Sequence, residues 1–112
     1  PGTGLADLGP RIRNWPVPPR APRPQHLAAL RASLDAVVAF APDLILVSAG
    51  FDAFVGDPLT AMTLEREDFA TLGAWLGATK IPAAAALEGG YSSDLPDLIE
   101  SFLTAWSAAV GV

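Results

Sequence analysis

The feature that most restricts the fold of this chain is a pair of short apolar segments set between longer stretches of helical periodicity. One is "DLILVSA" (residues 43–49), rich in branched residues, and the other is "IPAAAALE" (residues 81–88). Short apolar segments like the first are typical of strands covered on both faces. A helix between two such strands makes them parallel, with a right-handed crossover. We therefore predict an α/β fold, a parallel sheet with helices on both faces.

Helical segments surround both predicted strands. From residue 25 onward leucine and valine recur at helical spacing, and Pro42 ends that helix. A second helix follows a loop at residues 50–62, with Thr63 as its expected N-cap and acidic residues in its first turn. A third helix is predicted to open at residues 92–94.

The first 24 residues differ from the rest of the chain. They hold seven of the eleven prolines and four of the seven basic side chains. Proline lacks an amide donor and restricts the residue before it, so residues 1–24 are predicted to be an extended Pro/Arg-rich segment with a short strand near "RNWPV". Residues 25–112 form the predicted α/β portion.

Composition narrows the class of protein. The chain has 112 residues, 51% hydrophobic and 17% charged, which suits one small globular domain. Eleven of the twelve acidic residues follow residue 24, and an acidic body of this kind is not expected to bind nucleic acid. No apolar run is long enough to span a membrane. The absence of cysteine excludes disulfides and thiolate metal sites, and fits a cytoplasmic protein.

The candidate functional residues follow the two strands. The loops at residues 50–62 and 89–93 leave the carboxyl ends of the strands, where open α/β sheets bind ligands. We therefore expect Asp52 and Tyr91 at the same edge of the sheet. Asp52 either caps nearby loop amides or acts as a metal ligand or catalytic acid. Tyr91 either packs at the sheet edge with its hydroxyl in water, or donates a hydrogen bond to a developing oxyanion.

Other polar residues fit structural roles. Asp57, before Pro58, is predicted to build the loop, because Asp-Pro favours turn initiation. Glu88 either accepts loop amides or is an exposed acid at the strand end. The single histidine, His26, is predicted to be a surface or N-terminal helix residue. No Ser-His-Asp arrangement or phosphate-binding glycine loop is present.

Taken together, "PDLILVSAGFDAFVGDPL" and "LEGGY" resemble the C-terminal part of the histone deacetylase superfamily, nearest to bacterial members such as acetylpolyamine amidohydrolases and acetoin-utilisation-type proteins. The resemblance implies an arginase-like α/β fold, of which this chain is an incomplete C-terminal part. It implies zinc-dependent hydrolysis of an acetylated amine (acetyl-lysine or acetylpolyamine) to the free amine and acetate. By resemblance Asp52 is a ligand of Zn²⁺, Tyr91 polarises the acetyl carbonyl, and Gly89 and Gly90 shape the substrate pocket.

One departure from the family pattern shapes the prediction. The family's other zinc ligands, in a D-x-H motif, and its pair of catalytic histidines lie upstream of this segment, and His26 matches none of them. The expected partner is therefore the missing N-terminal portion of the domain, from the same polypeptide or a separate chain. The rival hypotheses are a non-catalytic binding or scaffold module derived from the family, and an unrelated doubly wound domain with no metal near Asp52.

Overall fold

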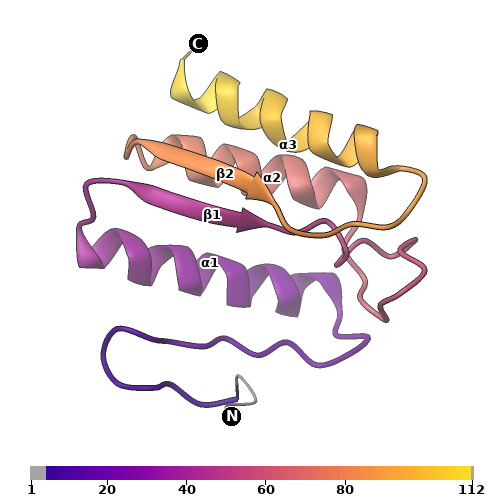
Figure 1. Cartoon of the computed structure of the whole chain (residues 1–112), viewed down its shortest axis with the longest axis horizontal. Coiled ribbons are helices and arrows are strands. Elements are labelled where there is room, and N and C mark those ends of the chain that lie inside the picture. Colours follow the sequence, from indigo (N-terminus) through magenta and orange to yellow (C-terminus); the bar gives the residue numbers. More distant parts are fainter. Residues whose placement is uncertain (1–4, 112) are drawn as a thin grey trace.

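The computed structural model describes residues 5–111, which form three helices and two strands in the order α1 (Arg23–Phe40), β1 (Ile45–Ala49), α2 (Arg66–Ala78), β2 (Ala83–Leu87) and α3 (Leu95–Val110) (Figure 1). The strands pair in parallel, with Ile45 opposite Ala83 and Ala49 opposite Leu87. Helix α2 is the crossover between them. The predicted α/β class with parallel strands is confirmed.

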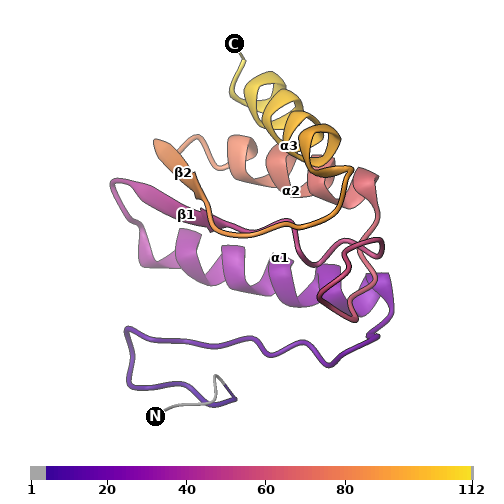
Figure 2. The same ribbon diagram turned by 45° about the vertical axis from the view of Figure 1, so that its right-hand side comes forward.

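The helices gather on one side of the strand pair. In Figure 1 α2 lies behind the strands, and the turned view of Figure 2 shows α1, α2 and α3 together on that side. The opposite face is open: the side chains of Leu44 and Leu46 are 53% and 75% exposed. Within residues 5–111 the helices therefore cover one face, and the second helical layer of the predicted fold does not come from these residues.

The core lies between the strands and the helices, and it reaches the loop after β1. The Phe51 ring packs against Phe69, with ring centroids 5.3 Å apart, and edge-on against Phe102 at 5.8 Å. Phe51 is only 4% exposed. Because Phe51 directly precedes Asp52, the aromatic core fixes the backbone that carries this carboxylate. The remaining buried apolar side chains of the cluster are Ile45, Leu64, Leu76 and Leu98.

Helices α2 and α3 approach each other closely. A Cβ added at Gly73 would lie 2.2 Å from the carbonyl oxygen of Phe102, and one at Gly77 would lie 2.6 Å from that of Trp106. Both glycines are buried. The missing side chains at these two positions therefore allow the backbones of the two helices to come into contact.

The ends of the helices differ from the prediction in two places. Helix α1 begins at Arg23, two residues early, because proline is tolerated in the first turn of a helix, where its missing amide has no partner to lose. Helix α2 is capped by Glu65 rather than Thr63: Glu65 and Asp68 form a reciprocal capping box. The Thr63 hydroxyl instead donates a hydrogen bond to the carbonyl of Ala21.

The segment before α1 is irregular. Residues 12–18 contain no strand, so the short strand predicted near "RNWPV" is not found in this described part of the chain. The segment is joined to the loop after β1, because the Arg20 N–H donates to the carbonyl of Ala61 over 2.7 Å. Among residues 5–111, no helix combines the length and apolar character that crossing a lipid bilayer requires.

Candidate functional site

The two loops that leave the strands run side by side at one edge of the sheet. The Glu88 N–H donates to the carbonyl of Ala49 over 3.0 Å, and the Phe51 N–H donates to the carbonyl of Gly89 over 2.9 Å. These bonds continue the parallel pairing beyond the ends of β1 and β2. Asp52 and Tyr91 therefore lie at the same edge, as expected from the order of the strands.

The Asp52 carboxylate and the Tyr91 hydroxyl converge above Gly89. A Cβ placed on Gly89 would lie 3.4 Å from Asp52 Oδ2 and 3.7 Å from Tyr91 Oη. Gly89 and Gly90 have φ angles of +149° and +131°, a region that side-chain-bearing residues rarely adopt. The glycine pair thus permits a turn that other residues would strain to form, and Gly89 keeps the space between the carboxylate and the phenol open.

Asp52 has a carboxylate with no partner in the described part of the chain. The residue is half-buried, and its backbone carbonyl accepts a hydrogen bond from the Thr60 hydroxyl. None of the hydrogen bonds or ion pairs formed among residues 5–111 involves its carboxylate oxygens. The alternative in which Asp52 caps loop amides is therefore not observed. A half-buried carboxylate without hydrogen bonds is a group suited to binding a cation.

Asp57, in the same loop, has the opposite environment. It is 5% exposed, and its two oxygens accept separate backbone N–H groups: Oδ1 from Leu59 over 2.9 Å and Oδ2 from Tyr91 over 2.8 Å. The first bond is the loop-building role predicted from the sequence. The second bond joins residues 34 positions apart, and no local pattern in the sequence indicates it.

The residues that the structure describes contain no complete metal site. No group of three or more His, Cys, Asp or Glu side chains within residues 5–111 is arranged to hold a metal ion. A catalytic zinc usually has three protein ligands and one open position. Asp52 has the donor chemistry of one such ligand, and residues 5–111 hold no further His, Cys, Asp or Glu side chains that would complete a set of three around it.

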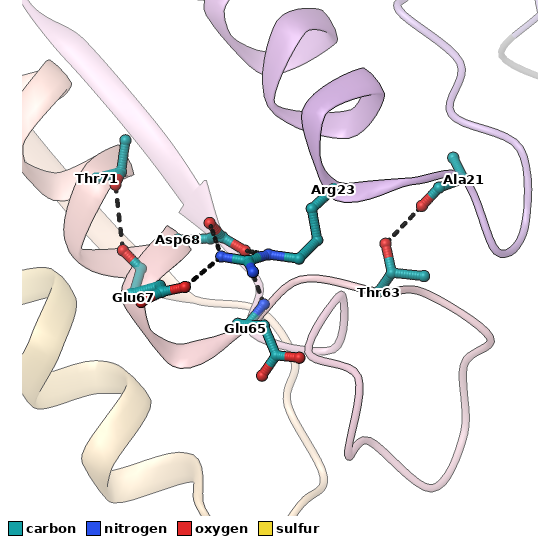
Figure 3. A network of polar contacts seen from close by, with 7 residues as sticks. All are labelled: Ala21, Arg23, Thr63, Glu65, Glu67, Asp68 and Thr71. Carbon is teal, nitrogen blue, oxygen red and sulfur yellow. Dashed lines mark hydrogen bonds and ion pairs between the residues drawn. The ribbon is translucent and has the colours of Figure 1, made fainter.

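A second polar cluster joins the starts of α1 and α2 (Figure 3). Arg23 donates to both oxygens of Asp68, over 2.8 and 3.0 Å, and to Glu67 over 2.5 Å. The hydrogen bonds to Asp68 and Glu67 raise the pKa of Arg23. Burial opposes ionisation of Asp68, but the hydrogen bonds from Arg23 and the Glu65 N–H outweigh it, and the pKa of Asp68 is lowered.

His26 lies in the first turn of α1, as predicted, but it is buried rather than at the surface. Its side chain is 6% exposed, and its Nδ1 atom has no hydrogen-bond partner in the part of the chain described. Burial lowers the pKa of His26, against the weaker opposing effect of the Asp68 charge. The remaining candidate, Glu88, is an exposed acid at the end of β2, which is the second of its two predicted alternatives.

Comparison with known proteins places the chain in a family. The Histone deacetylase domain family matches residues 2–107. A probable deacetylase of Methanothermobacter thermautotrophicus is 42% identical over 71 residues, which cover 62% of this chain and 22% of that protein. The acetylpolyamine amidohydrolase of Mycoplana ramosa is 35% identical over 78 residues, or 70% of this chain and 23% of the relative.

A solved structure agrees with these matches. The crystal structure of the acetylpolyamine aminohydrolase from Burkholderia pseudomallei has a TM-score of 0.83 to this chain at 28% sequence identity, covering 87% of this chain and 29% of that one. The chain thus spans less than a third of the length of these similar proteins. With nearly all of its residues matched by the family, the chain belongs to the histone deacetylase superfamily, of whose domain it is a part.

Proposed function

We propose that the complete protein containing this chain is a zinc-dependent deacetylase, which hydrolyses an acetylated amine (acetyl-lysine or acetylpolyamine) to the free amine and acetate. One observation carries the proposal: an unpartnered carboxylate, Asp52, and a phenol, Tyr91, converge over Gly89 at the carboxyl edge of parallel strands. The names of the similar proteins, deacetylases and acetylpolyamine amidohydrolases, support the same reaction class.

The proposed roles follow from the chemistry of the side chains. Asp52 supplies one carboxylate ligand to Zn²⁺, which when bound provides a Lewis acid for the amide carbonyl and lowers the pKa of water. The Tyr91 hydroxyl donates a hydrogen bond to the acetyl oxygen as negative charge develops on it. Gly89 and Gly90 shape the substrate pocket. A side chain at Gly89 would fill the space beside Asp52 and Tyr91, one at Gly90 would press on Leu95 and Phe51, and either would be strained at its positive φ.

The rest of the domain is the proposed partner of this segment, from the same polypeptide or from a separate chain. It would supply the other zinc ligands and the catalytic histidines. The open sheet face and a cavity of about 370 Å³ lined by residues of α1, β1 and α2 support this proposal, because they leave apolar side chains such as Leu46 uncovered. A cytoplasmic location, without membrane or nucleic-acid binding, stays a prediction from composition.

Replacement of Tyr91 by Phe in the complete protein tests the catalytic role. This change removes the hydroxyl and keeps the ring, so kcat for a small acetylated amine is expected to fall by about 10²–10³, the usual effect of losing one oxyanion donor. Bound metal is expected to stay at the wild-type level. Wild-type turnover in this variant would remove Tyr91 from the mechanism.

Replacement of Asp52 by Ala tests the metal role by a measurement independent of activity. Elemental analysis of the purified complete protein is expected to show loss of most of its zinc, because the loss of one of three protein ligands opens the site. Glu88→Gln, a change to an exposed acid at the end of β2, is the matched control and is expected to keep its zinc. Equal zinc content in the wild type, Asp52→Ala and Glu88→Gln would contradict the proposal.

A non-catalytic binding or scaffold module is the second candidate. It is favoured by the finding that residues 5–111 contain no group of three or more His, Cys, Asp or Glu side chains arranged to hold a metal ion. Sequencing the coding region upstream separates the two candidates. A D-x-H motif and a histidine pair there favour the enzyme, and their absence favours the module.

A further inference from the structure

Asp57 connects the two loops that carry the candidate catalytic groups. It is in the loop after β1, five residues beyond Asp52, and its Oδ2 accepts the backbone N–H of Tyr91 over 2.8 Å. Its Oδ1 accepts the Leu59 N–H over 2.9 Å, and its own N–H donates to the Phe54 carbonyl over 3.0 Å. With 5% exposure, this carboxylate is shielded from water, so both hydrogen bonds are strong and costly to lose.

The backbone around Tyr91 needs such an anchor. Gly89 and Gly90 have no side chains that could hold the turn by packing, and glycine has more backbone freedom than any other residue, so the turn depends on its hydrogen bonds. The Tyr91 side chain is 56% exposed, so packing within residues 5–111 holds it weakly. The carbonyl of Gly89 accepts the Phe51 N–H at the beginning of the loop after β2. Further along, before the start of α3, the hydrogen bond from Tyr91 to Asp57 attaches this loop to the loop that carries Asp52.

We propose that Asp57 is a positioning residue for Tyr91: its carboxylate holds the Tyr91 backbone and thereby places the phenol opposite Asp52. The proposal rests on the function proposed above for Tyr91. Each Asp57 oxygen already accepts a backbone N–H group, one of them from Tyr91, so we infer that Asp57 acts through Tyr91. An oxyanion donor works only when it is held at the position where charge develops, and small displacements reduce its effect.

The first test is Asp57→Asn in the complete protein. The amide has the same shape, but its single carbonyl oxygen can accept only one of the two N–H groups, and its NH₂ faces the other donor. We expect kcat to fall by roughly ten- to a hundredfold, the order expected when a catalytic group is misplaced by an ångström, with KM changed much less. Asp94→Asn is the matched control. Asp94 lies three residues beyond Tyr91, but its carboxylate is exposed and makes no capping hydrogen bond to α3.

The second test combines Asp57→Asn with Tyr91→Phe. If Asp57 acts by placing the phenol, the double variant is expected to be no slower than Tyr91→Phe alone, because there is no hydroxyl left to misplace. Losses that multiply would overturn the positioning role, since they would mean that Asp57 acts independently of Tyr91. A defect of folding alone would also give multiplying losses, so this measurement separates positioning from general loss of structure.

A third measurement does not depend on activity. Hydrogen exchange of the peptide spanning residues 88–95 is expected to become faster in Asp57→Asn, with exchange of the α2 and α3 peptides unchanged. Unchanged exchange at residues 88–95 would overturn the proposal. The outcomes are distinguishable: full activity of Tyr91→Phe contradicts the proposed function, whereas an impaired Tyr91→Phe together with a fully active Asp57→Asn contradicts only the role of Asp57.

Discussion

The carboxylates of Asp52, Asp57 and Asp68 differ in what they contact. Asp68 is paired with Arg23 and accepts the Glu65 N–H, and the buried Asp57 carboxylate accepts two N–H groups. Asp52 is half-buried with its carboxylate free of such contacts in residues 5–111. An uncompensated carboxylate is unfavourable away from water, so at the scale of the residue Asp52 is the one that a cation would stabilise.

His26 and Asp68 predict how stability depends on pH. Burial lowers the pKa of His26 below its ordinary value of 6.5, so the unfolded chain binds a proton that the folded chain resists. The free energy of unfolding is therefore expected to fall as the pH drops below 6.5. The pKa of Asp68 is lowered from 3.8, so its contribution is present above that pH and is lost in stronger acid. Unfolding temperatures of the complete protein across this pH range measure both steps.

Substitution separates the two steps. His26→Leu removes the titrating group and the unpaired Nδ1 atom, and it is expected to flatten the curve between pH 6.5 and 5 while leaving the acid step. Asp68→Asn is expected to weaken the acid step and to lower stability at neutral pH, because it removes the carboxylate that pairs with Arg23. A curve for His26→Leu that follows the wild type would contradict the assignment.

Sequence reasoning found Asp52 and Tyr91 because both follow a strand directly, where periodicity and strand order fix the edge of the sheet. It did not find the bond between Asp57 and Tyr91, because that contact depends on the path of two loops 34 residues apart in the chain. It predicted His26 as a surface or N-terminal helix residue; His26 does lie in the first turn of α1, but its burial was not predicted. A histidine beside a proline-rich segment gives no local sign that it is buried near Asp68.

At the scale of elements, contacts between distant segments decide where helices begin and how closely they pack. Thr63 has the residue type of an N-cap, yet its hydroxyl bonds to Ala21, and the capping box forms two residues later around Glu65. Periodicity predicted the existence of α2, but not this boundary. In the same helix Gly73 and Gly77 lower the intrinsic preference for helix and in exchange permit close contact with α3.

Replacement of Gly73 by Ala tests the packing of α2 against α3. Alanine favours helix over glycine, so an exposed site would be stabilised by this change. Here the added Cβ would lie 2.2 Å from the Phe102 carbonyl oxygen, and the helices would have to move apart. We expect the complete protein to lose about 1–3 kcal/mol, the usual effect of overpacking, measured by denaturant unfolding. A rise in stability would contradict the close contact.

At the scale of the molecule, one face of the strand pair is covered by helices and the other face is open. Two parallel strands with helices on a single side leave backbone edges and apolar side chains uncovered, and a pair of strands is marginal as a sheet. Sequence periodicity predicted the order of elements and the parallel pairing. It could not predict which face the described helices cover, because apolar residues on both faces of a strand do not show which face a given helix packs against.

Replacement of Leu46 by Ser is expected to have opposite effects in two settings. In the isolated segment Leu46 is 75% exposed, so the change should raise solubility and reduce association, as measured by sedimentation. In the complete protein, where we propose that the rest of the domain covers this face, loss of the buried side chain should lower stability by about 2–5 kcal/mol. Unchanged stability of the complete protein would contradict that coverage.

The composition of β2 has a consequence for whatever rests on the open face. Four of its five residues are alanine, and Ala84 and Ala86 are exposed. A neighbouring element there would touch nearly bare peptide, at a spacing set by methyl groups. Bulky side chains introduced at these positions would push the neighbouring element away. The small side chains of β2 therefore determine how closely the next layer can pack against the sheet.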